Sequence, residues 1–217
     1  MKIIDNYRLV LGSKSPRRKE LLGWLQIPFV VEVSTIEEIS AKIKPQMIAE
    51  DIAQKKGQDI LQKLIKDNFK QQLVVSADTI VCIDHEILGK PKDITEAKNM
   101  LMRLSNREHD VITAVYLGKY NQCMQDGCGK VFSCKTKVHF KKIDQDLLQN
   151  YLDSGDSMDK AGAYGIQGQS LTFIDRIEGS YSNVVGFPLD MFIDELKNFL
   201  GHPGETAGQW RKKIRSA

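Results

Sequence analysis

The sequence has no apolar run long enough to cross a lipid bilayer, because charged residues interrupt every hydrophobic segment. Near its start, "MKIIDNYRLVLG" also lacks the continuous apolar stretch of a signal peptide, since Asp5, Asn6 and Arg8 break it. The four cysteines are too few for a secreted disulfide scaffold in a chain of 217 residues. We therefore expect a cytoplasmic protein that does not bind a membrane.

The sequence also lacks a large excess of positive or negative charge. The net charge is only +3, and no basic stripe with interleaved aromatic residues occurs, so we expect no binding to nucleic acid. The P-loop pattern G-x-x-x-x-G-K-[ST] and the dinucleotide pattern G-x-G-x-x-G are absent, which disfavours P-loop NTPases and dinucleotide-dependent enzymes. The cysteine-bearing segment "CMQDGCGKVFSCKTKVHF" lacks the paired C-x-x-C spacing of a zinc site, so zinc is disfavoured too.

What the sequence does contain is a mixture of strand and helix patterns typical of one mixed α/β domain. Capping residues mark helix starts: Ser15 with Pro16 opens the first helix, and Asp93 with Glu96 resembles a capping box. Strands are expected at 7–11, 29–34 and 72–84 and on both sides of a loop at 121–130, and helices from 16, at 45–56, from 93, from 144 and at 188–200. We expect residues 1–200 to form this single domain, and the polar, basic tail 201–217 to be flexible or loosely docked.

Polar residues that could perform chemistry lie where strands and helices end, which is where sites are commonly built. Arg17 and Arg18 stand in the first turn of a helix whose free amides also attract anions. Asp78 interrupts an apolar strand, and a buried carboxylate costs several kcal/mol, roughly, unless a cation meets it. With Glu38 and Lys90, these residues fit a metal-bound polyphosphate: basic groups hold the phosphates and carboxylates hold Mg²⁺ or Mn²⁺.

Each feature also has an ordinary explanation. Paired arginines at a helix start are commonly a solvated face, and a lone aspartate in a strand is as often a structural hydrogen-bond acceptor. Glu37 and Glu38 by themselves are typical of an exposed acidic turn. In "AYGIQG" the glycines permit positive φ, and Gln167 could simply tie down the backbone. Taken singly, the residues leave both interpretations open.

Six motifs taken together favour the functional interpretation. They are "LGSKSPRRKELL", "SADTIV", "LGKPKD", "LSNREHDVITAV", "DKAGAYGIQG" and "GSYSNVVGFPL", in this order over roughly residues 7–195. In this set the chain resembles the Maf family of septum-formation-inhibitor-like nucleoside triphosphate pyrophosphatases. The resemblance implies an elongated, twisted mixed β-sheet of the ITPase-like kind, flanked by helices, with a cleft between two lobes. It also implies a metal-dependent enzyme that cuts a nucleoside triphosphate between its α and β phosphates, giving the monophosphate and diphosphate.

The resemblance also assigns roles to particular residues. Asp78 would accept the proton of the attacking water and, with Glu38, would hold the divalent cation, Mg²⁺ or Mn²⁺. The phosphates would be held by Ser13, Arg18 and Lys90. Selection of the base, in the branch that prefers dTTP and UTP, would fall to Arg17, Thr79 and Gln167. A sister branch that prefers 7-methylated GTP has Trp at the position of Arg17.

Wider roles are implied as well. Family members are associated with removal of modified nucleotides, here modified pyrimidine nucleotides, and with cell-division arrest, and many form homodimers. The rival hypothesis is a non-catalytic, nucleotide-sensing regulator of cell division that acts through a protein partner. The carboxylates and Lys90 speak against it, because a pure binder has little need of a water activator. The loop 121–130 and the tail after Leu200 have no counterpart in the family pattern.

Overall fold

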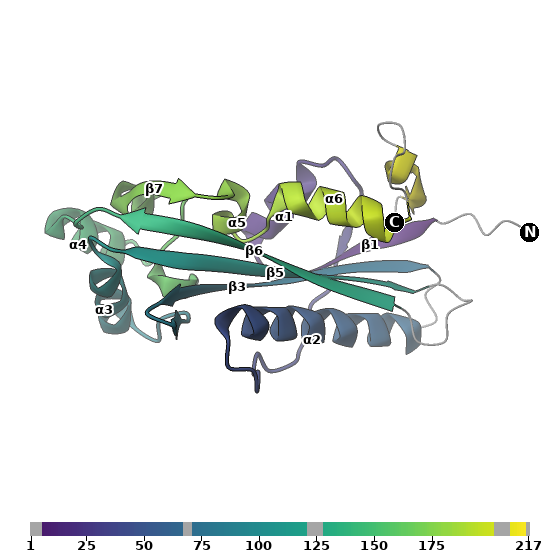
Figure 1. The fold of residues 1–217 in the computed structure, drawn as a ribbon, viewed down its shortest axis with the longest axis horizontal. Coiled ribbons are helices and arrows are strands. Elements are labelled where there is room, and N and C mark those ends of the chain that lie inside the picture. Colours follow the sequence, from purple (N-terminus) through teal and green to yellow (C-terminus); the bar gives the residue numbers. More distant parts are fainter. Residues whose placement is uncertain (1–5, 67–70, 121–127, 202–208, 216–217) are drawn as a thin grey trace, which may run out of the picture.

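The computed structural model describes residues 6–66, 71–120, 128–201 and 209–215. Within these residues, eight strands form one sheet of order β2-β1-β3-β5-β6-β7, in which β4 also pairs with β3 and β8 with β1. Strand β1 is parallel to β2, β3 and β8, whereas the other pairings are antiparallel. The sheet is therefore mixed, and the predicted mixed α/β class is confirmed (Figure 1).

The predicted elements are present in the predicted order, whereas the strands at 174–178 and 214–215 and the helix at 181–185 were not predicted. The strands are β1 (Tyr7–Gly12), β2 (Val30–Val31), β3 (Gln72–Ile83), β4 (Glu86–Leu88), β5 (Glu108–Tyr120), β6 (Cys128–Phe140), β7 (Ile174–Glu178) and β8 (Ile214–Arg215). The α-helices are α1 (Pro16–Gly23), α2 (Pro45–Lys66), α3 (Ile94–Leu104), α4 (Gln145–Asp153), α5 (Tyr181–Val185) and α6 (Leu189–Phe199), and 3₁₀-helices cover Ala161–Ala163, Gln169–Phe173 and Gln209–Lys213. The predicted caps are present: the side chains of Ser15 and Asp93 accept from the backbone amides of Arg18 at 3.4 Å and Glu96 at 2.8 Å.

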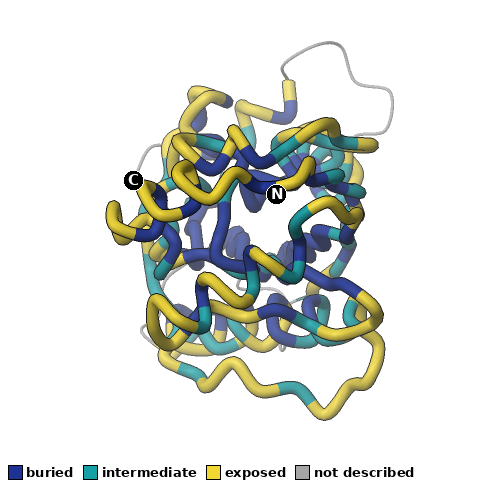
Figure 2. Tube along the Cα trace, turned by 90° about the vertical axis from the view of Figure 1, so that its left-hand side faces the viewer, coloured by how far each residue is buried: buried dark blue, intermediate teal, exposed yellow. Residues whose placement is uncertain are grey.

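Helices cover both faces of the sheet. Helix α2 lies along one face, α1, α5 and α6 lie over the other, and α3 and α4 pack at the end far from the termini (Figure 1). The end-on view in Figure 2 shows buried segments in the interior and exposed segments around them. The largest fully buried side chains, Tyr151, Phe173, Phe187 and Phe192, belong to one core cluster together with Leu9 and other sheet residues. Burial of these apolar surfaces stabilises the layered arrangement.

Helix α2 is longer than the predicted 45–56. Its apolar stripe continues through Ile60, Leu61 and Leu64, which pack against Val10 and Val74 of the sheet, and this packing extends the helix to Lys66. The predicted strand at 29–34 is shorter, because only Val30 and Val31 pair with β1.

The close approach of α2 to the sheet depends on Gly57. A Cβ at this position would lie 2.1 Å from the ring of Tyr116 and 2.5 Å from Ser76 Oγ. Ser76 Oγ also donates a hydrogen bond of 2.7 Å to the carbonyl of Ala53. The helix is therefore held close to β3 and β5 at this point, and the preceding residue, Lys56, lies beside Asp78 at the centre of β3.

Part of the tail is docked, whereas the sequence left open whether it is flexible or loosely docked. Trp210 and Ile214 are each 6% exposed and belong to the main core cluster. Strand β8 pairs with Tyr7 and Arg8 of β1, and Arg211 donates a hydrogen bond of 2.8 Å to the carbonyl of Leu25. Residues 202–208 and 216–217 of the tail, and 121–127 of the predicted cysteine-bearing loop, lie outside the described residues. In the part of the chain that is described, no helix has the length and apolar character to cross a membrane.

Candidate active site

A cleft opens where the sheet has a gap beside β3. One edge of β3 pairs with β1 from Gln72 to Ser76 and with β4 from Val81 to Ile83. Between them, residues 77–80 have no strand on that edge among the described residues, while β5 continues along the other edge. A cleft of about 1130 Å³ is lined by these four residues and by parts of α1, α2 and α5.

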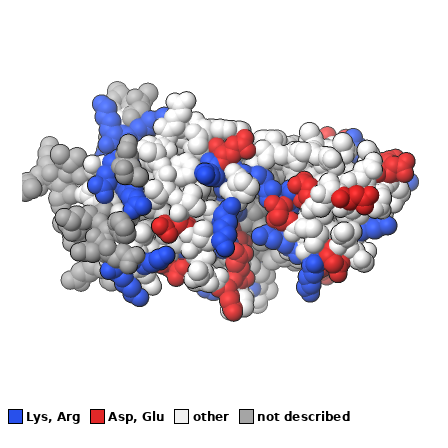
Figure 3. All heavy atoms as spheres, turned by 180° about the vertical axis from the view of Figure 1, so that it is seen from behind, with Lys and Arg blue, Asp and Glu red and all other residues white. Residues whose placement is uncertain are grey.

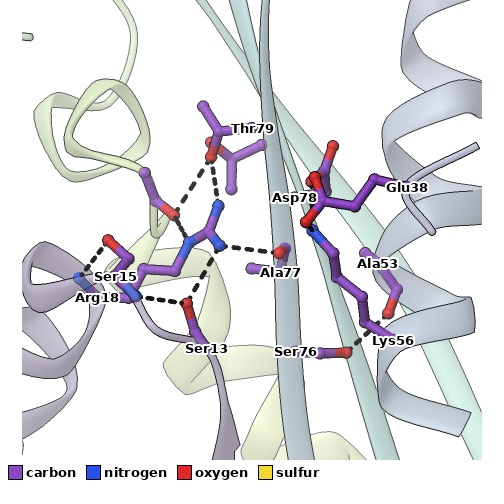
Figure 4. A network of polar contacts seen from close by, with 12 residues as sticks. Ser13, Ser15, Arg18, Glu38, Ala53, Lys56, Ser76, Ala77, Asp78 and Thr79 are labelled. Carbon is purple, nitrogen blue, oxygen red and sulfur yellow. Dashed lines mark hydrogen bonds and ion pairs between the residues drawn. The ribbon is translucent and has the colours of Figure 1, made fainter. Parts of the chain in front are cut away.

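The gap lets side chains from both faces of the sheet reach one cleft. Successive strand residues point to opposite faces, so Asp78 faces α2 while Thr79 faces Arg18 of α1 (Figure 4). Because no strand borders β3 there, both side chains line the same cleft. All the predicted site residues line it: Ser13, Arg17, Arg18, Glu38, Asp78, Thr79, Lys90 and Gln167. The structure therefore brings together residues that are far apart in the sequence.

On the α2 side, Lys56 joins the two predicted metal ligands. Its Nζ lies 2.8 Å from Asp78 Oδ1 and 2.7 Å from Glu38 Oε1 (Figure 4). The side chains of Lys56 and Asp78 are only 12% and 10% exposed, whereas that of Glu38 is 58% exposed. Asp78 thus has the cation that a carboxylate in a buried strand requires.

Burial and charge act in opposite directions on these carboxyl groups. Burial raises the pKa of Asp78 above its ordinary value, although Lys56 and Arg18 oppose the rise. Burial also acts to raise the pKa of Glu38, but the hydrogen bond and charge of Lys56, with a contribution from Lys90, lower it below its ordinary value. Two neighbouring carboxyl groups therefore have pKa values that are displaced apart, which is a common property of functional sites.

On the other face, Arg18 is held by the protein itself. Its Nε donates to the carbonyl of Gly186 at 2.8 Å and its Nη2 to Thr79 Oγ1 at 2.8 Å. Its Nη1 donates to the carbonyl of Ala77 at 2.9 Å and to Ser13 Oγ at 3.4 Å. These contacts use four of the five guanidinium N–H groups. Arg18 therefore fills the gap beside β3, and one of its five N–H groups takes no part in these contacts.

Arg17 has a different partner across the cleft. Its Nη2 lies 3.3 Å from Asp159 Oδ2, and its side chain is 24% exposed. The buried Lys160 in turn holds Asp159. Its Nζ contacts Asp159 Oδ1 at 2.8 Å and Asp156 Oδ1 at 2.6 Å. Lys90 is exposed and Gln167 is half-buried where they line the cleft. Arg17 and Gln167 therefore border the part of the cleft formed by residues 156–168.

Comparison with known proteins identifies the family. The family model described as Maf-like protein matches residues 8–199. The chain belongs to this family. A dTTP/UTP pyrophosphatase of Caldanaerobacter subterraneus subsp. tengcongensis is 41% identical over 195 residues, covering 89% of this chain and 90% of that protein. The dTTP/UTP pyrophosphatase of Bacillus velezensis is 40% identical, covering 88% of this chain and 96% of that protein. That of Symbiobacterium thermophilum is also 40% identical, covering 93% of this chain and 98% of that protein. The Maf resemblance of the sequence motifs is thus confirmed.

Three residues of this Maf-like protein's cleft were missed by the sequence reasoning: Lys56, Asp159 and Gly186. For Lys56 a signal exists, because it follows Ala49, Ile52 and Ala53 at helical spacing and so places a cation on the buried stripe of α2. Asp159 lies within the motif "DKAGAYGIQG" but faces a partner distant in sequence. Gly186 contributes only its carbonyl, and no residue-type pattern predicts that contact.

The donor atoms of the Maf cleft fit a hard divalent cation. Asp78 and Glu38 supply carboxylate oxygens that converge on the same ammonium group of Lys56. Among the described residues, no group of three or more His, Cys, Asp or Glu side chains is arranged to hold a metal. One or two carboxylates are what Mg²⁺ commonly uses when substrate phosphates and water complete its coordination.

Charged side chains of both signs are intermixed over much of one face of this Maf-like protein. Figure 3 shows Lys and Arg beside Asp and Glu across the middle and the far end of one face, while basic side chains gather toward the end that carries the termini. Oppositely charged exposed groups largely offset one another in water.

Proposed function

We propose that this Maf-like protein hydrolyses dTTP and UTP, and modified pyrimidine nucleoside triphosphates, to the monophosphate and diphosphate. The observation that carries the proposal is the cluster of Asp78, Lys56 and Glu38 in the same cleft as the basic residues of α1 and Lys90. The printed names of the relatives, dTTP/UTP pyrophosphatase, support the substrate class.

In this proposal Asp78 accepts the proton of the attacking water. Its raised pKa supports the role, because a base whose pKa lies nearer the working pH transfers protons more effectively. Lys56 keeps the carboxylate charged and oriented by its hydrogen bond. Mg²⁺ or Mn²⁺, held by Glu38 and Asp78, would neutralise phosphate charge when bound.

The phosphates are proposed to bind at the start of α1. The Ser13 hydroxyl, the first residues of α1 and Lys90 line this part of the cleft, and a helix N-terminus favours anions. Arg18 adds its remaining N–H. Base selection is proposed for Arg17, Thr79 and Gln167, which line the same cleft. Of these, Thr79 points away from Asp78, toward Arg18 (Figure 4).

The test is incubation of the protein with UTP, dTTP and a panel of canonical and modified triphosphates, with Mg²⁺ or Mn²⁺. Diphosphate release, strongest with UTP and dTTP, is the expected result. Release of single phosphate, or no turnover across the whole panel, would contradict the proposal. Action in the cytoplasm, cell-division arrest and homodimer formation remain predictions from the family resemblance.

A further inference from the structure

A chain of hydrogen bonds leads from the cleft into the core. Arg18 Nη2 donates to Thr79 Oγ1 at 2.8 Å, and Thr79 Oγ1 lies 3.0 Å from Thr113 Oγ1 of β5. Thr113 Oγ1 lies 3.0 Å from the main-chain carbonyl of Asn183 in α5. Thr113 is fully buried and does not line the cleft, whereas Thr79 does.

The direction of this chain follows from what each group can do. A carbonyl only accepts, so Thr113 gives its single hydroxyl proton to Asn183. Thr79 must then give its own proton to Thr113, because its other acceptor, the carbonyl of Gly186, is distant at 3.5 Å. The hydrogen bonds therefore run from Arg18 through Thr79 to Thr113, and bonds aligned in this way strengthen one another.

The far end of the chain is rigid. Asn183 is fully buried, and its Nδ2 donates to the carbonyl of Val111 at 3.1 Å and to Thr136 Oγ1 at 2.9 Å. Thr136 Oγ1 also accepts from the backbone amide of Ser180 at 3.0 Å. The side chain of Asn183 is thus hydrogen-bonded to both β5 and β6, and these bonds hold the residue whose carbonyl accepts from Thr113.

We propose that Thr113 is a positioning residue that makes Thr79 a hydrogen-bond acceptor toward the bound base. The inference rests on the proposed function, in which Thr79 helps to select a pyrimidine. Uracil and thymine present an N3–H donor between two carbonyls, whereas cytosine has an acceptor at N3. A Thr79 oxygen whose proton is directed inward accepts from the N3–H of uracil and offers nothing to the N3 of cytosine. A site built around a hydrogen bond rejects a base that leaves that bond unmade.

The experiment compares Thr113→Val, which keeps the shape and removes the hydroxyl, with Thr113→Ser, which keeps the hydroxyl. The readout is the ratio of kcat/KM for UTP to that for CTP, measured by diphosphate release. We expect Thr113→Val to lower this ratio about tenfold and Thr113→Ser to leave it within about twofold of the unmodified protein. Thr113→Ala serves in the same comparison if the valine variant does not fold.

Ser105→Ala is the matched control, because Ser105 Oγ accepts a hydrogen bond of 2.9 Å from the amide of Ile143 and belongs neither to the cleft lining nor to the hydrogen-bond chain of Thr79. We expect it to lower stability without changing the ratio. A ratio unchanged in Thr113→Val, or lowered equally in Ser105→Ala, overturns the inference while leaving the proposed function intact. Failure of the unmodified protein to release diphosphate from UTP would instead remove the proposed function, and this inference with it.

Discussion

Lys56 Nζ donates a hydrogen bond of 2.8 Å to Asp78 Oδ1, which joins the middle of helix α2 to the central strand β3. The same nitrogen lies 2.7 Å from Glu38 Oε1, so one cation holds two carboxylates from different elements. Sequence reasoning identified both carboxylates as site residues but not the lysine between them. The contact makes helix α2 part of the candidate active site.

Asp78→Asn should remove most turnover while leaving nucleotide binding. The amide no longer accepts the proton of water, and loss of such a group commonly costs about 10²- to 10⁴-fold in rate. Diphosphate release and equilibrium binding of UTP measure the two properties. Glu37→Gln, at an exposed neighbour of Glu38, is the matched control and should keep full activity. Unchanged turnover in Asp78→Asn would exclude the proposed base.

Lys56→Met should destabilise the fold and reduce activity together. It removes the cation beside a largely buried carboxylate, and breaking such a pair costs about 3 kcal/mol. The pKa of Asp78 should rise further, because Lys56 acts to lower it. Urea unfolding and diphosphate release test both effects. Lys55→Met, on the exposed side of the same helix, should change the free energy of unfolding by less than about 0.5 kcal/mol.

Arg17→Trp should weaken the preference for pyrimidine triphosphates. The indole cannot pair with Asp159, so the cleft loses the cation that this ion pair orients. The ratio of kcat/KM for UTP to that for 7-methyl-GTP should fall. Lys19→Trp places the same side chain at an exposed position of α1 and should leave the ratio unchanged. An unaltered ranking in Arg17→Trp would remove Arg17 from the specificity residues.

His109 should make the protein sensitive to acid. Burial, with a smaller effect of His139, lowers the pKa of His109 to about 3, and its Nδ1 has no hydrogen-bond partner among the described residues. The folded state therefore keeps His109 neutral, whereas the unfolded chain takes up a proton near the ordinary pKa of about 6.5. The stability it contributes is present above pH 6.5 or so and is lost as the pH falls toward 3.

His109→Gln removes this titration at a position where His109 Nε2 lies 2.5 Å from Tyr164 Oη. Between pH 7 and pH 4.5, unfolding in urea should show the unmodified protein losing about 2 kcal/mol more than the variant. Equal losses of unfolding free energy in the two proteins would show that His109 does not cause the destabilisation at low pH.

Gly57→Ala should lower the free energy of unfolding by about 1–3 kcal/mol. The added methyl group would meet the ring of Tyr116 at 2.1 Å, so α2 must move away from the sheet. Gly23→Ala is the control, because a Cβ there meets no atom within 4 Å. Thermal unfolding compares the two variants, and equal melting temperatures would mean that α2 tolerates the shift.

The sequence by itself determined the family, the mixed α/β class, the helix starts and eight of the residues that line the cleft. These features depend on short-range signals: the Ser15 cap lies three positions before the amide it binds, and each Maf motif is a short continuous segment. The activity of the individual site residues remains a proposal to be tested.

Only the tertiary structure decided how those residues are paired. Arg18 bonds to the carbonyl of Gly186, 168 positions away, and Lys56 reaches Asp78 only because α2 packs closely on the sheet. Docking of Trp210 into the core likewise depends on the pairing of strand β8 with Tyr7 and Arg8 of β1. Such contacts depend on strand register and on backbone groups that every residue possesses, so no local pattern of residue types specifies them.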